Sequence, residues 1–159
     1  GNGFLPKSIL VIPNGYIATG GTAGGFVISK SGDNGQGRMT LYPSPKQSSV
    51  GFTIEHSGDG GYIITGVYDD SQGRVTLFIN KTYPDKGAMP SMEWSKSLVI
   101  GKDGSRGYSG RLTSDGGYII LGSIYTGNGV DLILIKTDKD GNTKPGILKD
   151  RDWFFINST

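Results

Sequence analysis

Gly117-Tyr118-Ile119 is the third occurrence of one tripeptide in this chain of 159 residues. The same residue types stand at Gly15-Tyr16-Ile17 and at Gly61-Tyr62-Ile63. Four residues after each tyrosine comes a further glycine, at Gly20, Gly66 and Gly122. Because self-similarity at spacings of tens of residues is typical of repeat architectures, the chain is predicted to contain three copies of one unit.

A short apolar run ending in lysine follows each tyrosine, at Lys30, Lys81 and Lys136. A turn rich in Gly, Asp and Asn comes after each run, and Gly and Asn accept the positive φ angles of hairpin turns at little cost. The third run, 132–135, is wholly apolar. Such a run predicts a strand that is buried on both faces.

The second unit shows the expected strands most clearly. Val50, Phe52 and Ile54 alternate with polar residues, which is the period of a half-buried strand. Further strands are predicted at 62–67 and 76–81, and a fourth around 93–98. No segment has a helical period with capping residues. The sequence therefore predicts a single all-β domain of three four-stranded antiparallel repeats, at approximately 4–46, 47–102 and 103–159.

Composition excludes several classes of protein. Sixteen Lys and Arg residues stand against 14 Asp and Glu residues, and the two signs are mixed along the chain, so nucleic-acid binding is not expected. The chain has no cysteine, which excludes disulfides, thiolate nucleophiles and cysteine-ligated metals. No apolar run approaches the roughly 18–20 residues that a membrane span needs.

The third copy carries a longer motif, Ser114-Asp115-Gly116-Gly117-Tyr118, and a later Asp140-Gly141-Asn142. It resembles the DGGY-type β-propeller repeats of bacterial and archaeal surface and secreted proteins. The second copy keeps Asp59-Gly60-Gly61-Tyr62, whereas the first copy has only Asn14 before its Gly-Tyr pair. The resemblance implies propeller-like blades, an extracellular or cell-surface location, and a non-catalytic role in recognition or assembly.

Three blades are fewer than the roughly 4–8 of a closed propeller. Open blade edges invite strand addition, so a homo-oligomer or a neighbouring domain is the expected partner. A six-bladed ring made of two chains would account for the low number of blades. So would a chain that is one piece of a longer propeller. The alternative fold is a β-trefoil, which closes on a pseudo-threefold axis and would suit a carbohydrate-binding, lectin-like module.

Aromatic and polar residues in and beyond the loops after the second strands form the candidate ligand site. A tyrosine ring offers an apolar face and a polar tip, a combination that suits a glycan. The residues expected to line this site are Tyr68, Asp69, Asp70, Arg74, Tyr125, Asn128 and Asp131. Asp69 and Asp70 equally fit a solvated loop.

Asp138, Asp140 and Asn142 resemble the start of a calcium loop, because alternating oxygen ligands can wrap a hard cation. Leu148 and Lys149 stand where such a loop needs a bidentate Glu, so a hairpin turn is the alternative, and no other cofactor is expected. No catalytic residues are assigned: the chain has one His and no Gly-x-Ser-x-Gly elbow, so it is not expected to be an enzyme. A glycan hydrolase is a third function considered, since paired acids can meet in a cleft.

Overall fold

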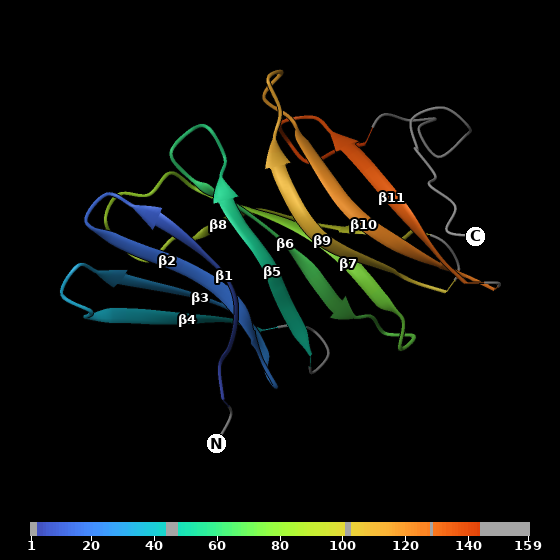
Figure 1. Cartoon of the computed structure of the whole chain (residues 1–159), viewed down its shortest axis with the longest axis horizontal. Coiled ribbons are helices and arrows are strands. Elements are labelled where there is room, and N and C mark those ends of the chain that lie inside the picture. Colours follow the sequence, from blue (N-terminus) through green and yellow to red (C-terminus); the bar gives the residue numbers. More distant parts are fainter. Residues whose placement is uncertain (1–2, 44–47, 101–102, 128, 144–159) are drawn as a thin grey trace.

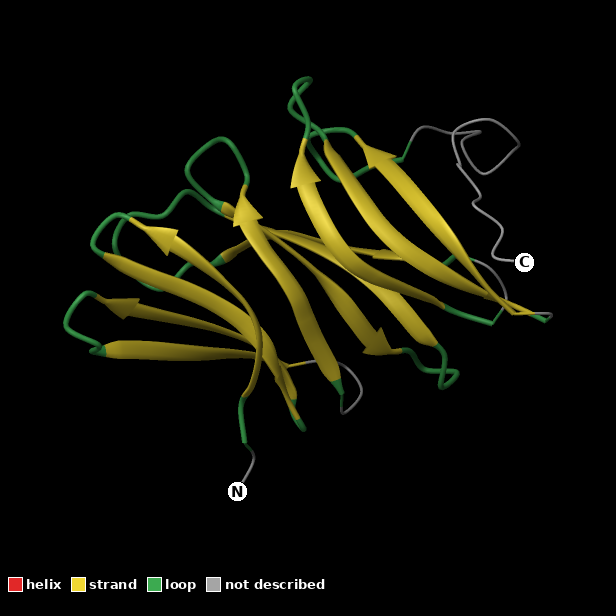
Figure 2. Ribbon diagram, in the orientation of Figure 1, coloured by secondary structure: helices red, strands yellow, loops and turns green. Residues whose placement is uncertain are grey.

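Strands and the turns between them make up the part of the chain that the structure describes, residues 3–43, 48–100, 103–127 and 129–143 of a computed structural model (Figure 2). No helix occurs in these residues, and the predicted all-β class is confirmed. A helix of the length and apolar character needed to cross a membrane is therefore also missing from them.

The strands pair with antiparallel neighbours in three consecutive groups, which we call the first, second and third meanders (Figure 1). The first meander contains β1 (Leu5–Ile12), β2 (Gly15–Thr22), β3 (Gly25–Gly32) and β4 (Gly37–Pro43). The second meander contains β5 (Ser49–His56), β6 (Tyr62–Asp69), β7 (Val75–Thr82) and β8 (Met92–Leu98), which coincide with the strands predicted there. The third meander contains β9 (Ser105–Leu112), β10 (Tyr118–Thr126) and β11 (Gly129–Thr137).

The fourth strand expected for the third repeat, around Trp153 and Phe155, falls outside the described residues. Pairing of Gly21 with Val50 and of Thr22 with Ser49 joins the first two meanders into one curled eight-stranded sheet. The third meander forms a separate three-stranded sheet. Within the described residues β4, β8 and β11 each have one strand neighbour, so these strands do not close into a ring.

One irregularity occurs at the same place in all three meanders. The recurrent glycine of the second strand pairs with the first strand, and the next residue of the first strand is then left out of the ladder. The residues left out are Lys7, Phe52 and Tyr108. At Gly66 an added Cβ would lie 2.0 Å from the Val50 carbonyl oxygen, so only glycine allows this bulged approach. The recurrent glycine thus has the same structural role in each unit.

The meanders pack face to face, and the first strands of the second and third meanders each pack on the meander before. β5 packs against β1, β2 and β3, and β9 packs against β5, β6 and β7 (Figure 1). The core between the first and second meanders contains Ile12, Ile17, Phe26, Ile28, Ile54, Tyr62, Ile64 and Phe78. The core between the second and third contains Ile63, Leu77, Ile79, Tyr118, Ile120, Ile133 and Ile135. The middle strands of the second meander, β6 and β7, are therefore buried on both faces.

β11 is buried on one face only. Ile133 and Ile135 are fully buried, whereas Leu132 is 37% exposed and Leu134 is half-buried. The prediction of a strand buried on both faces is wrong here. The outer side of β11, which carries Leu132 and Leu134, points away from the second meander, and no other described meander covers it.

Candidate functional site

The repeated Asp-Gly-Gly turn joins the first and second strands of the second and third meanders. Asp59 Oδ1 accepts hydrogen bonds from Ser57 Oγ at 2.5 Å and from the Gly61 backbone N–H at 3.1 Å. Asp115 makes the same two contacts in the third meander. In the second meander, Gly60 lies between Asp59 and Gly61 and has a φ of +91°, a conformation that favours glycine. The aspartate of the motif therefore builds its own turn.

The lysine at the end of the third strand completes this arrangement. Lys81 Nζ lies 2.6 Å from Asp59 Oδ2, and Lys136 Nζ lies 2.8 Å from Asp115 Oδ2. Lys81 also pairs with Glu93. Burial favours a higher pKa for Asp59, but the hydrogen bonds from Lys81, Ser57 and Gly61 prevail and lower this pKa to about 2.

The first meander has no aspartate in this turn, and its lysine bonds elsewhere. Asn14 occupies the turn at φ +63°, and Lys30 reaches across to the second meander, where its Nζ lies 2.7 Å from both carboxylate oxygens of Asp85. The Tyr62 hydroxyl donates to the same carboxylate at 2.6 Å. Burial acts to raise the pKa of Asp85, but these two partners lower it overall. A cross-meander ion pair thus replaces the pair within the turn.

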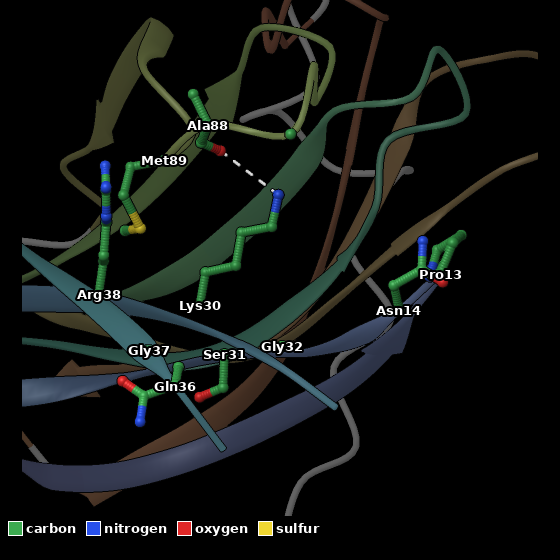
Figure 3. Close-up of a pocket in the computed structure, with 11 residues that line it drawn as sticks. Pro13, Asn14, Lys30, Ser31, Gly32, Gln36, Gly37, Arg38, Ala88 and Met89 are labelled. Carbon is green, nitrogen blue, oxygen red and sulfur yellow. Dashed lines mark hydrogen bonds between the residues drawn. The ribbon is translucent and has the colours of Figure 1, made fainter. Parts of the chain in front are cut away.

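Cavities open along this end of the meanders. One of about 660 Å³ lies beside β3 and β4 and is drawn in Figure 3. Lys30 lies between Met89 and Asn14 in this view, and its Nζ contacts the Ala88 carbonyl oxygen at 3.4 Å. Arg38 adds a second cationic side chain to the lining.

Two further cavities lie between meanders, at corresponding places. The Tyr62 pocket, about 380 Å³, lies between the first and second meanders and is lined by Ile12, Pro13, Lys30, His56, Gly60, Tyr62, Asp85 and Gly87. The Trp94 pocket, about 500 Å³, lies between the second and third meanders. Its lining includes Asp59, Lys81, Glu93, Trp94, Leu112, Tyr118, Lys139 and Asp140. The Trp94 pocket is the candidate functional site.

The residues predicted as a ligand site lie at the opposite end of the strands. Asp70 closes its own turn, since Oδ1 accepts from the Gln72 and Arg74 backbone N–H groups and Oδ2 pairs with the Arg74 guanidinium at 2.8 Å. Asp69 accepts a hydrogen bond from Ser48. Asp69 is the last residue of β6, and the Asp70 side chain is 11% exposed, so Asp70 is held by its own turn and is not solvated as the loop interpretation expected.

Tyr125 belongs to a separate group, on the third meander. The Arg106 guanidinium lies 5.6 Å from its ring centre, and Asp131 stands on β11 opposite Ile124. Asn128 lies outside the described residues. No described hydrogen bond, ion pair or ring contact joins the side chains of this group to Tyr68. The backbones are closer, since the Tyr125 N–H donates to the Gly104 carbonyl oxygen and Gly104 lies against Val75, the strand partner of Asp69.

Asp138 also serves its own turn. Its Oδ1 accepts from the backbone N–H groups of Asp140 at 2.9 Å and of Asn142 at 2.8 Å. Asp140 in turn pairs with Lys139. Within the described ranges no group of three or more His, Cys, Asp or Glu side chains is placed to hold a metal ion. The contacts match a hairpin turn, the alternative to a calcium loop.

The Trp94 pocket was absent from the sequence predictions, although one signal pointed toward it. The second and third copies each carry both a turn aspartate and a lysine at the end of the third strand, Asp59 with Lys81 and Asp115 with Lys136. Aligning the copies then brings Lys81, Asp59 and the repeated tyrosine to one end of the strands. Comparison of the sequence with protein-family models and with curated proteins gives no match.

Proposed function

We propose that this chain is a non-catalytic β-repeat protein of propeller type, in which each meander is a blade, and that it acts by assembly through its two end faces. One observation carries the proposal. The repeated tyrosine is 3% exposed at Tyr62 and 1% exposed at Tyr118, but 46% exposed at Tyr16. Tyr62 and Tyr118 are covered by the preceding meander, whereas Tyr16 has no described meander before it.

The first end face is the outer side of the first meander. Ile9 and Val11 of β1 are 68% and 69% exposed, and Val11 stands directly beside Tyr16 on this face. Met39 and Leu41 of β4 are also exposed. Contiguous apolar surface of this kind is uncommon on monomers and typically marks an interaction site.

The other end face is the outer side of the third meander, and we call it the third end face after that meander. It carries Ile119, Leu121, Leu132 and Leu134. Ile119, Leu132 and Leu134 occupy the positions that Ile63, Leu77 and Ile79 hold in the second meander, where the third meander buries them, and Leu121 occupies the position of the buried Thr65. The two end faces are therefore the two halves of an interface that the chain already makes twice internally.

A hydrogen bond from a backbone N–H to a side-chain hydroxyl occurs at both internal interfaces and supports this complementarity. The Ser8 hydroxyl accepts from the Ile54 N–H at 3.4 Å, and the Thr53 hydroxyl accepts from the Gly110 N–H at 3.3 Å, each across a meander interface. By strand register, Ser109 carries the corresponding hydroxyl on the third end face, and Ile9 carries the corresponding N–H on the first.

We propose a second copy of this chain as the partner that covers both faces. Head-to-tail contacts form a closed ring when the rotation closes, and two chains of three blades give six, within the usual range of about 4–8. The sequence placed association at open blade edges, but the exposed apolar residues favour the faces. The extracellular or cell-surface location and the membership of the DGGY-type repeats belong to the same proposal and depend on the motif resemblance.

Light scattering coupled to size exclusion tests the assembly. We expect twice the 16.9 kDa chain mass, and the single-chain mass for Tyr16→Asp, because a buried unpaired carboxylate opposes the contact. Tyr83 is the matched control, since it is 52% exposed in the loop between β7 and β8, away from both faces. Tyr83→Asp should keep the double mass. A single-chain mass for the unmodified protein at all concentrations would reject the proposal.

A further inference from the structure

We infer that the Trp94 pocket binds an uncharged saccharide, with one site per chain. The inference starts from a comparison of two pockets that the repeat places at equivalent interfaces. By sequence register, Lys30 corresponds to Lys81, His56 to Leu112, Tyr62 to Tyr118, and Asp85 to Asp140. The same framework is therefore present twice, once filled by the protein's own groups and once open.

The Tyr62 pocket satisfies its own polar groups. Asp85 receives the Lys30 ammonium at 2.7 Å and the Tyr62 hydroxyl at 2.6 Å, so its carboxylate has two partners inside the pocket. His56 covers one side, with its ring centre 5.8 Å from that of Tyr62. This pocket offers little for a ligand to bond.

The Trp94 pocket lacks the corresponding contacts. Lys81 is held by Asp59 and Glu93 of its own meander, and Asp140 pairs with its neighbour Lys139. Tyr118 is 1% exposed and lines the pocket, yet its hydroxyl makes no hydrogen bond to any described residue. In the described residues the fully buried side-chain atoms without a partner are Ser49 Oγ and Arg106 Nε, so the Tyr118 hydroxyl is accessible from the pocket, where a ligand can bond to it.

The lining matches the chemistry of a sugar ring. Trp94 is half-buried, meets Tyr118 edge-on with ring centres 6.1 Å apart, and lies near Leu112 in the same lining. An aromatic wall of this kind packs against the C–H face of a pyranose. Carboxylates of Asp59 and Glu93 accept from sugar hydroxyls, while the lysine ammonium groups donate to them.

The charged side chains that line the Trp94 pocket, and the volume of this pocket, restrict the class of ligand further. Three carboxylates, from Asp59, Glu93 and Asp140, face two ammonium groups, from Lys81 and Lys139, and each charge already has an opposite partner. The carboxylates would repel a bound anion, and a bound cation would have to displace a lysine from its carboxylate partner. An uncharged polar ligand therefore fits best. The volume of about 500 Å³ lies within the usual range for small-ligand pockets.

Fluorescence titration tests the inference directly. The chain has two tryptophans, so Trp153→Phe leaves Trp94 as the single indole reporter. The probes are the methyl pyranosides of glucose, galactose, mannose and N-acetylglucosamine, with calorimetry on the unmodified chain to give stoichiometry. We expect a saturable change with at least one sugar, at one site per chain.

Matched tyrosine variants separate this pocket from its counterpart. Tyr118→Phe removes one hydroxyl partner and should weaken binding about tenfold, whereas Tyr62→Phe should leave binding unchanged. Trp94→Ala removes the reporter and is therefore titrated by calorimetry, where it should show no binding, with circular dichroism to confirm the fold. No saturable change up to about 100 mM sugar, where a site of about 10 mM Kd would be filled, overturns the inference. Equal effects of the two tyrosine variants also overturn it. Because the pocket lies within one chain, this result does not depend on whether the chain assembles.

Discussion

Asp59 accepts two hydrogen bonds from its own turn and a third from Lys81, so its carboxylate is held in the ionised form. A carboxyl with a pKa of about 2 in the folded chain and about 3.9 in the unfolded chain binds fewer protons when folded between these values. The stability that Asp59 contributes is therefore fully present above about pH 4 and is lost as the pH falls through about 2.

Replacing this carboxyl should change how stability depends on pH. We expect the free energy of unfolding of the unmodified chain to fall between about pH 4 and pH 2, and Asp59→Asn to lower it at pH 7 and flatten this fall. Urea denaturation at a series of pH values measures both effects. An identical pH dependence in the two proteins would show that Asp59 has no such role.

Lys30 and Asp85 connect two meanders, and their side chains are 17% and 13% exposed. A double-mutant cycle with Lys30→Met and Asp85→Asn should give a coupling free energy of about 1–3 kcal/mol, as expected for a hydrogen-bonded pair shielded from water. The pair of Lys139 and Asp140, 75% and 57% exposed, is the control and should couple by less than about 1 kcal/mol. Equal coupling in both cycles would contradict this assignment.

At the scale of elements, the sequence predicted the strands of the second meander to within a few residues, because period-2 alternation and glycine-rich turns are local signals. The bulge opposite each recurrent glycine was not predictable, although the glycines themselves were seen. A bulge depends on how two strands align, and a single glycine does not reveal that alignment. The bond between Lys30 and Asp85 joins residues far apart in sequence, so composition and spacing gave no indication of it.

The bulge glycine should tolerate no side chain. In Gly66→Ala the new Cβ would meet the Val50 carbonyl oxygen at 2.0 Å, and we expect a loss of about 3 kcal/mol or more in the free energy of unfolding. Gly24 is the control, because a Cβ there has Leu41 Cδ2 as its nearest neighbour, at 3.6 Å. Gly24→Ala should change stability by less than about 1 kcal/mol in urea denaturation. Similar losses in both variants would refute the steric argument.

For the whole molecule, the repeat count was readable from the tripeptides, but the burial of each copy was not. Tyr16, Tyr62 and Tyr118 are the same residue type in the same local sequence, and only their position in the stack makes one exposed and two buried. The apolar run of β11 was interpreted as doubly buried for the same reason. Local sequence carries no information on which repeat stands at an end.

The end faces make a prediction that no single variant can test. In a head-to-tail contact the first end face of one chain meets the third end face of another, so both halves must be intact. Ile9→Asp damages the first face, and Leu121→Asp damages the third, at positions 68% and 37% exposed. Each variant alone should show the single-chain mass, because every possible contact then contains one damaged half.

Mixing the two variants should restore one contact. The undamaged third face of Ile9→Asp can then meet the undamaged first face of Leu121→Asp, which gives a species of twice 16.9 kDa by light scattering. This species should dissociate at higher concentration than the unmodified pair, because it has one interface in place of two. If Leu121→Asp alone keeps the double mass, the first faces instead associate with each other about a two-fold axis. If the mixture stays at the single-chain mass while the unmodified chain is paired, the two faces do not form a common interface.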